Sequence, residues 1–179
     1  MKTIKLAFIT IGTALATPSC TPTHHDMDGQ PAKLGDFSYQ APAGWTQTKS
    51  KGWHSVSTTW TPDNNDQKES IVVIRTQIDS ALGQAGAEAI KKKLLAAQRE
   101  LPQVQVLGSP IDFHSDGGFA GVRVEDNFIP AGAKYQYHRT HAVLVEGTDI
   151  IHVLYTAEQP DAEERALHLV VNSLHKSEG

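Results

Sequence analysis

The sequence has 179 residues, of which 39% are hydrophobic and 20% charged, with a single cysteine, 14 glycines and 9 prolines. This length fits one domain with appendages. The hydrophobic fraction excludes a wholly disordered chain, one cysteine excludes a disulfide framework, and no apolar run reaches the roughly 18 residues of a membrane-spanning helix. The formal net charge of −4 excludes the basic surface that nucleic-acid binding needs.

Residues 1–19 are typical of an export signal, because two lysines precede a mostly apolar stretch over residues 6–16. Two processing sites are open. Cleavage before Cys20 would leave a lipid-modified cysteine at the new N-terminus, whereas the Ala14-Leu15-Ala16 pattern would direct ordinary cleavage after Ala16 and release a soluble, secreted or periplasmic chain. We expect lipidation, because the only cysteine follows the apolar stretch and opens a polar tract. The predicted location is the cell envelope, anchored at a periplasmic or outer-membrane surface.

Residues 20–35 are predicted to form a flexible tether, since polar residues, proline and glycine there follow neither a helical nor a strand period. Residues 36–179 are predicted to form the globular domain. The predicted leader carries two lysines and no acidic residue, so the mature chain has a net charge of 14 − 20 = −6.

Three strands are predicted in the first half of the domain. Aromatic and polar residues alternate at 37–39, and a longer alternation over 53–60 puts Trp53 and Trp60 on opposite sides of its strand. The continuous β-branched run at 70–77 is typical of a strand covered on both faces, so it is placed centrally.

A helix is predicted over residues 80–101, where apolar residues recur every three or four positions before Pro102. A second amphipathic helix is predicted over residues 160–175, with a proline at its first turn. Four further strands are predicted between the helices, at 104–113, 119–125, 135–146 and 149–156. Runs of strands separated by two such helices predict an α+β fold, with an antiparallel sheet of six to seven strands flanked by two helices.

The opening FSYQAPAGW, the long helix before the four-strand run, the hairpin ending VLYTAEQ and the closing helix VVNSLH together resemble the PsbP-like superfamily. This superfamily includes the extrinsic PsbP proteins of photosystem II and the DcrB-type bacterial lipoproteins. The resemblance covers residues 36–175 and implies an α/β/α sandwich that commonly acts as a non-enzymatic binding or assembly module. It supplies no catalytic residues, and nothing in the sequence marks the photosystem branch.

The sequence contains no G-x-S-x-G, H-E-x-x-H, P-loop or G-x-G-x-x-G motif, so we predict neither an enzyme nor a cofactor. The predicted function is an exported, lipid-anchored binding or assembly module, whose partners are the membrane and an unidentified envelope protein or small ligand. The alternative is an immunity or inhibitor lipoprotein that neutralises a toxin, since a net charge of −6 suits a basic partner.

Two histidines form the first candidate site. A two-residue turn at Gly147-Thr148 pairs Val143 with His152, which places His141 and His152 diagonally on one face of a hairpin. Two imidazoles on rigid strands are half of a zinc or copper site, which His54 or His114 would complete. The alternative interpretation is a polar patch at the edge of a sheet face, and a slip of one residue in register would separate the pair.

Four aromatic residues form the second candidate site, a surface for a ligand or partner. Exposed aromatic side chains commonly anchor binding partners, and the candidates here are Trp53, Trp60, Tyr135 and Tyr137. Core packing is the alternative, but the opposite orientations predicted for the two tryptophans place at least one of them outside the core.

Overall fold

The structure is a computed structural model and describes residues 28–64, 68–79, 84–99, 103–130, 132–158 and 163–177. The predicted signal peptide, Cys20 and most of the predicted tether lie outside the described residues. The strands are β1 (Gly29–Leu34), β2 (Phe37–Pro42), β3 (Trp45–Lys51), β4 (Ser55–Pro62), β5 (Ser70–Gln77), β6 (Val104–His114), β7 (Ala120–Phe128), β8 (Tyr137–Glu146), β9 (Asp149–Ala157) and β10 (His175–Lys176), and the helices are α1 (Gln84–Arg99) and α2 (Glu163–Ser173).

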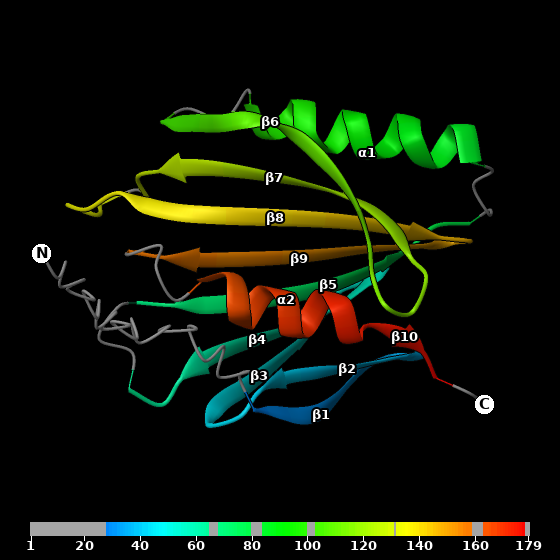
Figure 1. Cartoon of the computed structure of the whole chain (residues 1–179), viewed down its shortest axis with the longest axis horizontal. Helices are drawn as coiled ribbons and strands as arrows, with labels where there is room; N and C mark the ends of the chain where they lie inside the picture. Colours follow the sequence, from blue (N-terminus) through cyan, green and yellow to red (C-terminus); the bar gives the residue numbers. More distant parts are fainter. Residues whose placement is uncertain are drawn as a thin grey trace, which may run out of the picture.

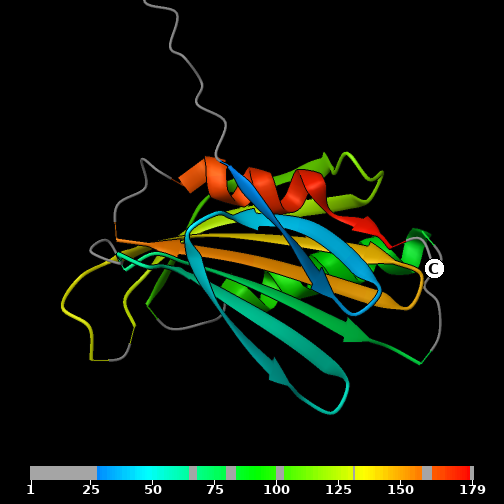
Figure 2. The same cartoon turned by 90° about the horizontal axis from the view of Figure 1, so that it is seen from below.

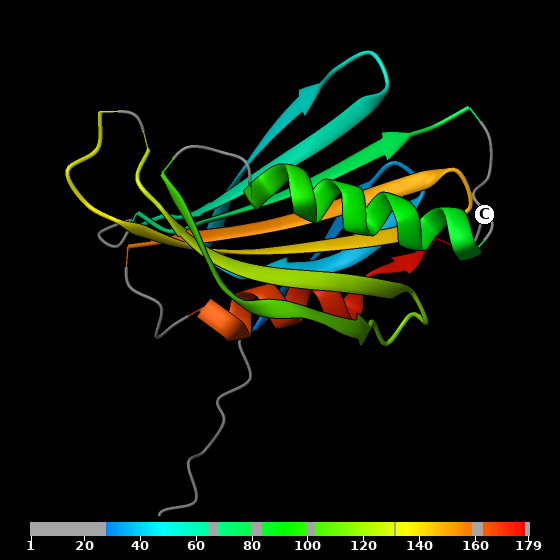
Figure 3. The same ribbon diagram turned by 90° about the horizontal axis from the view of Figure 1, so that it is seen from above.

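The strands form two antiparallel sheets (Figure 1). The large sheet has seven strands in the order β3-β4-β5-β9-β8-β7-β6, and the small sheet has three in the order β1-β2-β10. The small sheet and α2 lie on one face of the large sheet, as seen from below (Figure 2), and α1 crosses the other face (Figure 3). The predicted α+β fold, a sheet of six to seven antiparallel strands flanked by two helices, is therefore confirmed.

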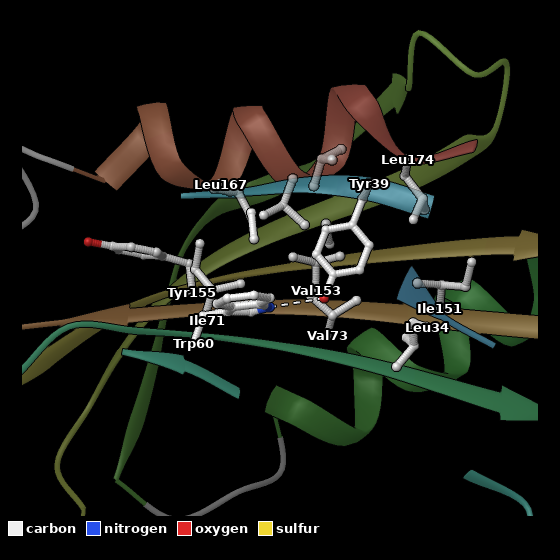
Figure 4. Close-up of a cluster of buried hydrophobic side chains, with 14 of the residues drawn as sticks. Leu34, Tyr39, Trp60, Ile71, Val73, Ile151, Val153, Tyr155, Leu167 and Leu174 are labelled. Carbon is white, nitrogen blue, oxygen red and sulfur yellow. Dashed lines mark hydrogen bonds between the residues drawn. The ribbon is translucent and has the colours of Figure 1, made fainter. Parts of the chain in front are cut away.

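The main core lies between the large sheet, α2 and the small sheet (Figure 4). Tyr39 from β2 and Leu167 from α2 are buried against large-sheet residues such as Val153. The indole nitrogen of Trp60 donates a hydrogen bond of 2.9 Å to the hydroxyl of Tyr39. Each such buried apolar side chain stabilises the fold by about 1.5–3 kcal/mol relative to an exposed one.

A smaller apolar cluster lies under α1. It joins Val143, Val145 and Ile150 of the β8–β9 hairpin to Ile90 of α1. Strand β5 lies between β4 and β9 in the large sheet, and its residues 70–77 match the predicted central strand. On the face toward α2, Ile71 and Val73 are fully buried, whereas Val72 and Ile74 on the face toward α1 are half-buried.

The predicted tether is wrong at its C-terminal end, because β1 pairs with β2 from Gly29↔Pro42 to Leu34↔Phe37. Only Ala32 and Leu34 of this strand are buried, so the sequence carries a weak apolar alternation. Pro31 also argues against a central strand, and it is tolerated here because β1 is an edge strand. The folded domain thus begins before residue 36.

Two further strands differ from the prediction. Strand β3 is polar and exposed along most of its length. Its sequence therefore lacks the alternation of apolar and polar residues by which a strand is recognised. The strand predicted from residue 53 begins at Ser55 and leaves Trp53 in the β3–β4 turn. The second helix ends at Ser173, so that His175 lies in β10 and pairs with Ser38 of β2.

Candidate functional site

The structure brings His141 and His152 together on the face of the large sheet that α1 covers. The predicted register is confirmed, since Val143 lies opposite His152 and His141 lies opposite Leu154. Nε2 of His141 and Nδ1 of His152 are 3.0 Å apart, a hydrogen-bond distance, and the rings stack with centroids 5.2 Å apart. One imidazole therefore donates to the other when both are neutral.

This histidine pair is held in its neutral form. Burial, the adjacent His152 and then Arg139 lower the pKa of His141 to about 3, and burial lowers the pKa of His152. The guanidinium of Arg139 makes two contacts of 3.0 and 3.1 Å to the buried carboxylate of Asp126. The α1 face thus contains a compact polar network, in which the buried carboxylate of Asp126 already has an arginine partner.

The proposed completion of a metal site finds no support in the positions of the other histidines. His54 lies beside Trp53 in the β3–β4 turn, and His114 ends β6 on the pocket side of the sheet. Within the described ranges, no group of three or more His, Cys, Asp or Glu side chains is arranged to hold a metal. A structural zinc site needs four ligands, and the pair amounts to two side chains that are within hydrogen-bond distance of each other.

The four aromatic candidates do not form one surface. Trp60 is only 4% exposed and lies in the main core, so its prediction as a surface residue is wrong. Trp53 is 93% exposed and Tyr135 60% exposed. Trp53 lies near the end of β5 at Gln77, whereas Tyr137 begins β8 at the other end of the sheet. Tyr137 packs against Phe128 with ring centroids 5.9 Å apart.

A pocket of about 260 Å³ lies between α2 and the β6–β8 side of the large sheet. Small-molecule sites are concave and mostly apolar, with a few polar groups that orient the ligand, and the pocket has this character. Its lining is Phe113, His114, Arg123, Ala142, Leu167, His168, Val171 and Asn172. The small sheet lies on the other side of α2 from this pocket (Figure 1).

The β6–β7 hairpin lies at the C-terminal end of α2 (Figure 1), and Phe113 and His114 at the end of β6 line the pocket. The backbone N–H of Asp116 donates a hydrogen bond of 3.0 Å to the carbonyl oxygen of Asn172. A Cβ added at Gly117 would lie 2.3 Å from the carbonyl oxygen of Leu174, so only glycine allows this approach. The ring of Phe113 likewise lies over Gly121, within 2.6 Å of where a Cβ would be.

No protein family model matches the sequence, and no curated protein matches it. Solved structures do resemble it. The chain aligns over 88% of its length with 97% of cyanobacterial PsbP (CyanoP) from Synechocystis sp. PCC 6803, at 16% identity and a TM-score of 0.58. The chain has a PsbP-like fold.

Two other solved structures resemble the chain. LpqN, described as involved in cell envelope biogenesis of Mycobacterium tuberculosis, aligns over 88% of this chain and 90% of its own, at 14% identity and a TM-score of 0.55. A structure from Bacteroides thetaiotaomicron VPI-5482 aligns over 85% of this chain at 12% identity and a TM-score of 0.53, and this chain spans about 50% of that protein's length. None of the described helices is long and apolar enough to cross a membrane.

Sequence reasoning missed most of the polar side chains of the pocket in this PsbP-like domain. His114 was considered only as a metal ligand, and Arg123, His168 and Asn172 were not singled out. The sequence did hold one signal for Arg123, namely a charged residue in the middle of a strand. In the structure, β7 directs this side chain toward α2. Recognising it required knowledge of which face α2 covers.

Proposed function

We propose that this chain is an exported, lipid-anchored and non-enzymatic binding module of the cell envelope. The observation that carries the proposal is the pocket beside α2, which lies in a fold shared with LpqN, a protein described as involved in cell envelope biogenesis. Apolar side chains and an arginine line this pocket, and such groups suit the recognition of a ligand.

The N-terminal sequence supports the anchored form of this proposal. The apolar stretch over 6–16 is followed by the only cysteine of the chain, as expected when a diacylglyceryl group is attached there. The acyl chains would hold the domain at a membrane surface without a spanning segment. Residues 21–28 and the cysteine itself would then separate the lipid from the first strand, β1.

Fractionation of cells that express the full chain tests the anchor. We expect the parent chain in the membrane fraction and the Cys20→Ser variant in the soluble fraction of the envelope, because the variant cannot accept the lipid. Thr21→Ser is the matched control, since it changes a neighbouring residue and keeps the cysteine. Equal amounts of parent and Cys20→Ser in the membrane fraction would refute lipid anchoring.

The binding role has a separate test. Chemical crosslinking in intact cells, followed by purification and mass spectrometry, should give one partner at stoichiometric level or a bound small molecule. Recovery of the anchored chain with neither would contradict a binding function.

A further inference from the structure

Arg123 is the polar side chain of the pocket that most needs a partner. Its Nε atom is buried and has no hydrogen-bond partner among the described residues. The nearest carboxylate is that of Glu125, 3.9 Å from a terminal nitrogen of Arg123, which is too long for a hydrogen bond. A buried donor left without an acceptor costs about 1–3 kcal/mol, and more when it is charged.

The other arginines buried in the sheet are satisfied. Arg75 binds Asp149 at 2.7 Å, and Arg139 binds Asp126 at 3.0 Å. Asp126 lies directly opposite Arg139, and Asp149 lies two residues from the position opposite Arg75. The residues opposite Arg123 are Ile111 and Ala142. The guanidinium of Arg123 therefore lines the pocket with no carboxylate of the described residues within hydrogen-bond distance of its buried Nε atom.

The rest of the pocket restricts which acceptor would fit. None of the described residues that line it is an aspartate or a glutamate, and Phe113, Ala142, Leu167 and Val171 form its apolar part. A guanidinium binds a carboxylate with two parallel hydrogen bonds. A single arginine suits one negative charge, and the apolar lining suits a hydrocarbon or aromatic body. The volume of about 260 Å³ lies below the range of about 300–1,000 Å³ typical of drug-sized ligands, so the molecule is small.

We propose that the pocket between α2 and β6–β8 binds a small monocarboxylate with an apolar body, whose carboxylate pairs with Arg123. His168 and Asn172 at the mouth of the pocket offer further hydrogen bonds to it. The inference rests on the proposed function, because it names the class of ligand that the binding module takes.

The test is a titration of the full chain carrying Cys20→Ser with hexanoate. Nuclear magnetic resonance monitors the backbone amides during the titration. This background removes any lipid, so that neither acyl chains nor detergent compete for the pocket. We expect saturable shifts at the amides of residues lining the pocket, and weaker binding of the neutral match hexan-1-ol. No saturable shift with hexanoate, or equal affinity for hexanoate and hexan-1-ol, would overturn the proposal.

Arg123→Gln should weaken hexanoate binding by about tenfold or more and leave hexan-1-ol binding unchanged, because only the charged hydrogen bonds are lost. Lys49→Gln is the matched control: it removes the same charge from the exposed strand β3 at the far edge of the sheet, and it should bind like the parent. If Arg123→Gln fails to fold, Arg123→Lys keeps the charge, loses the planar fork and should weaken hexanoate binding severalfold. Unchanged hexanoate affinity in the folded variant would overturn the role of Arg123.

The two proposals fail in distinguishable ways. If the anchored chain crosslinks to a stoichiometric partner but does not bind hexanoate, only the proposal of a carboxylate ligand is refuted. If the chain binds hexanoate through Arg123 but is found unanchored and outside the envelope, the proposed location is refuted and the proposed ligand class of the pocket stands.

Discussion

The hydroxyl of Tyr39 lies in the main core, where it accepts the indole N–H of Trp60 at 2.9 Å. Burial raises the pKa of this tyrosine above its usual value. Tyr39→Phe would leave the buried indole donor without an acceptor, so we expect the free energy of unfolding to fall by about 1–3 kcal/mol in urea denaturation. Tyr135→Phe makes the same chemical change at an exposed position and should be neutral. Equal stability of both variants would contradict this account.

The buried histidine pair makes stability depend on pH. The pKa of His141 is lowered from 6.5 to about 3 in the folded chain, so the unfolded chain binds more protons between these values. Stability is therefore lost as the pH falls through this window, by about 1.4 kcal/mol per pH unit for each such proton. His141→Gln should reduce the slope of unfolding free energy against pH by nearly that amount.

His54→Gln is the matched control for this slope, because His54 is exposed in the β3–β4 turn. We expect its unfolding free energy to follow the parent from about pH 6 to about pH 4. The explanation would be wrong if His141→Gln kept the slope of the parent over this range.

At the scale of single residues, the sequence predicts side chains whose neighbours are local. The pairing of His141 with His152 follows from a two-residue turn and the period of two in strands. The burial of Trp60 does not follow from local sequence, because it depends on Tyr39 from the small sheet. The position of Arg123 next to α2 likewise depends on packing between distant segments.

Among the elements, the small sheet is tied to the large sheet by Arg75 of β5. Its guanidinium binds Asp149 of β9 at 2.7 Å and Asp36 of the β1–β2 turn at 3.1 Å. The side chain of Asp149 is only 7% exposed, whereas that of Asp36 is 70% exposed. Arg75→Met would leave a buried carboxylate unpaired, and we expect a loss of about 3 kcal/mol in unfolding free energy.

Asp36→Asn is the control for this link, because an exposed ion pair contributes at most about 1 kcal/mol. Denaturation of the two variants under the same conditions compares the buried and the exposed contact. If Arg75→Met were no less stable than Asp36→Asn, the buried contact with Asp149 would contribute no more to stability than the exposed contact that links the two sheets.

The β6–β7 hairpin reaches α2 through Gly117. Gly117→Ala would force a Cβ to within 2.3 Å of the carbonyl of Leu174, so we expect a loss of about 1–3 kcal/mol and local shifts around the pocket. Gly29→Ala is the control, because the added Cβ would come no closer than 3.0 Å to its nearest neighbours, which are side-chain atoms of Gln40 and not backbone. Thermal unfolding and amide spectra measure both effects, and a Gly117→Ala variant that matches Gly29→Ala in both would contradict the close approach.

Elements with strong internal patterns were predicted well. The strands at 70–77 and 149–157 are rich in β-branched residues, and the bounds predicted for β5 match those observed. Strands β1, β3 and β10 were missed because they lie at sheet edges and bury few or no side chains. Edge strands keep polar residues that prevent further pairing, and these residues hide the strand pattern.

For the whole molecule, the PsbP-like fold follows from the two sheets and two helices, and the resemblance stated from the sequence is confirmed by structures only 14–16% identical to it. Identity this low shows the fold alone. The function proposed for the chain therefore depends on its own residues, namely the export-type N-terminus and the pocket with Arg123. Neither the ligand nor the partner is encoded in a motif that sequence reasoning recognises.

Native mass spectrometry of the protein recovered from its own membranes tests the central claim, an anchored binding module, most directly. The account predicts a chain that begins at Cys20, carries a diacylglyceryl mass and retains a bound partner or small molecule. An unmodified and uncomplexed chain, such as one that begins at Thr17 after cleavage behind Ala16, would contradict it.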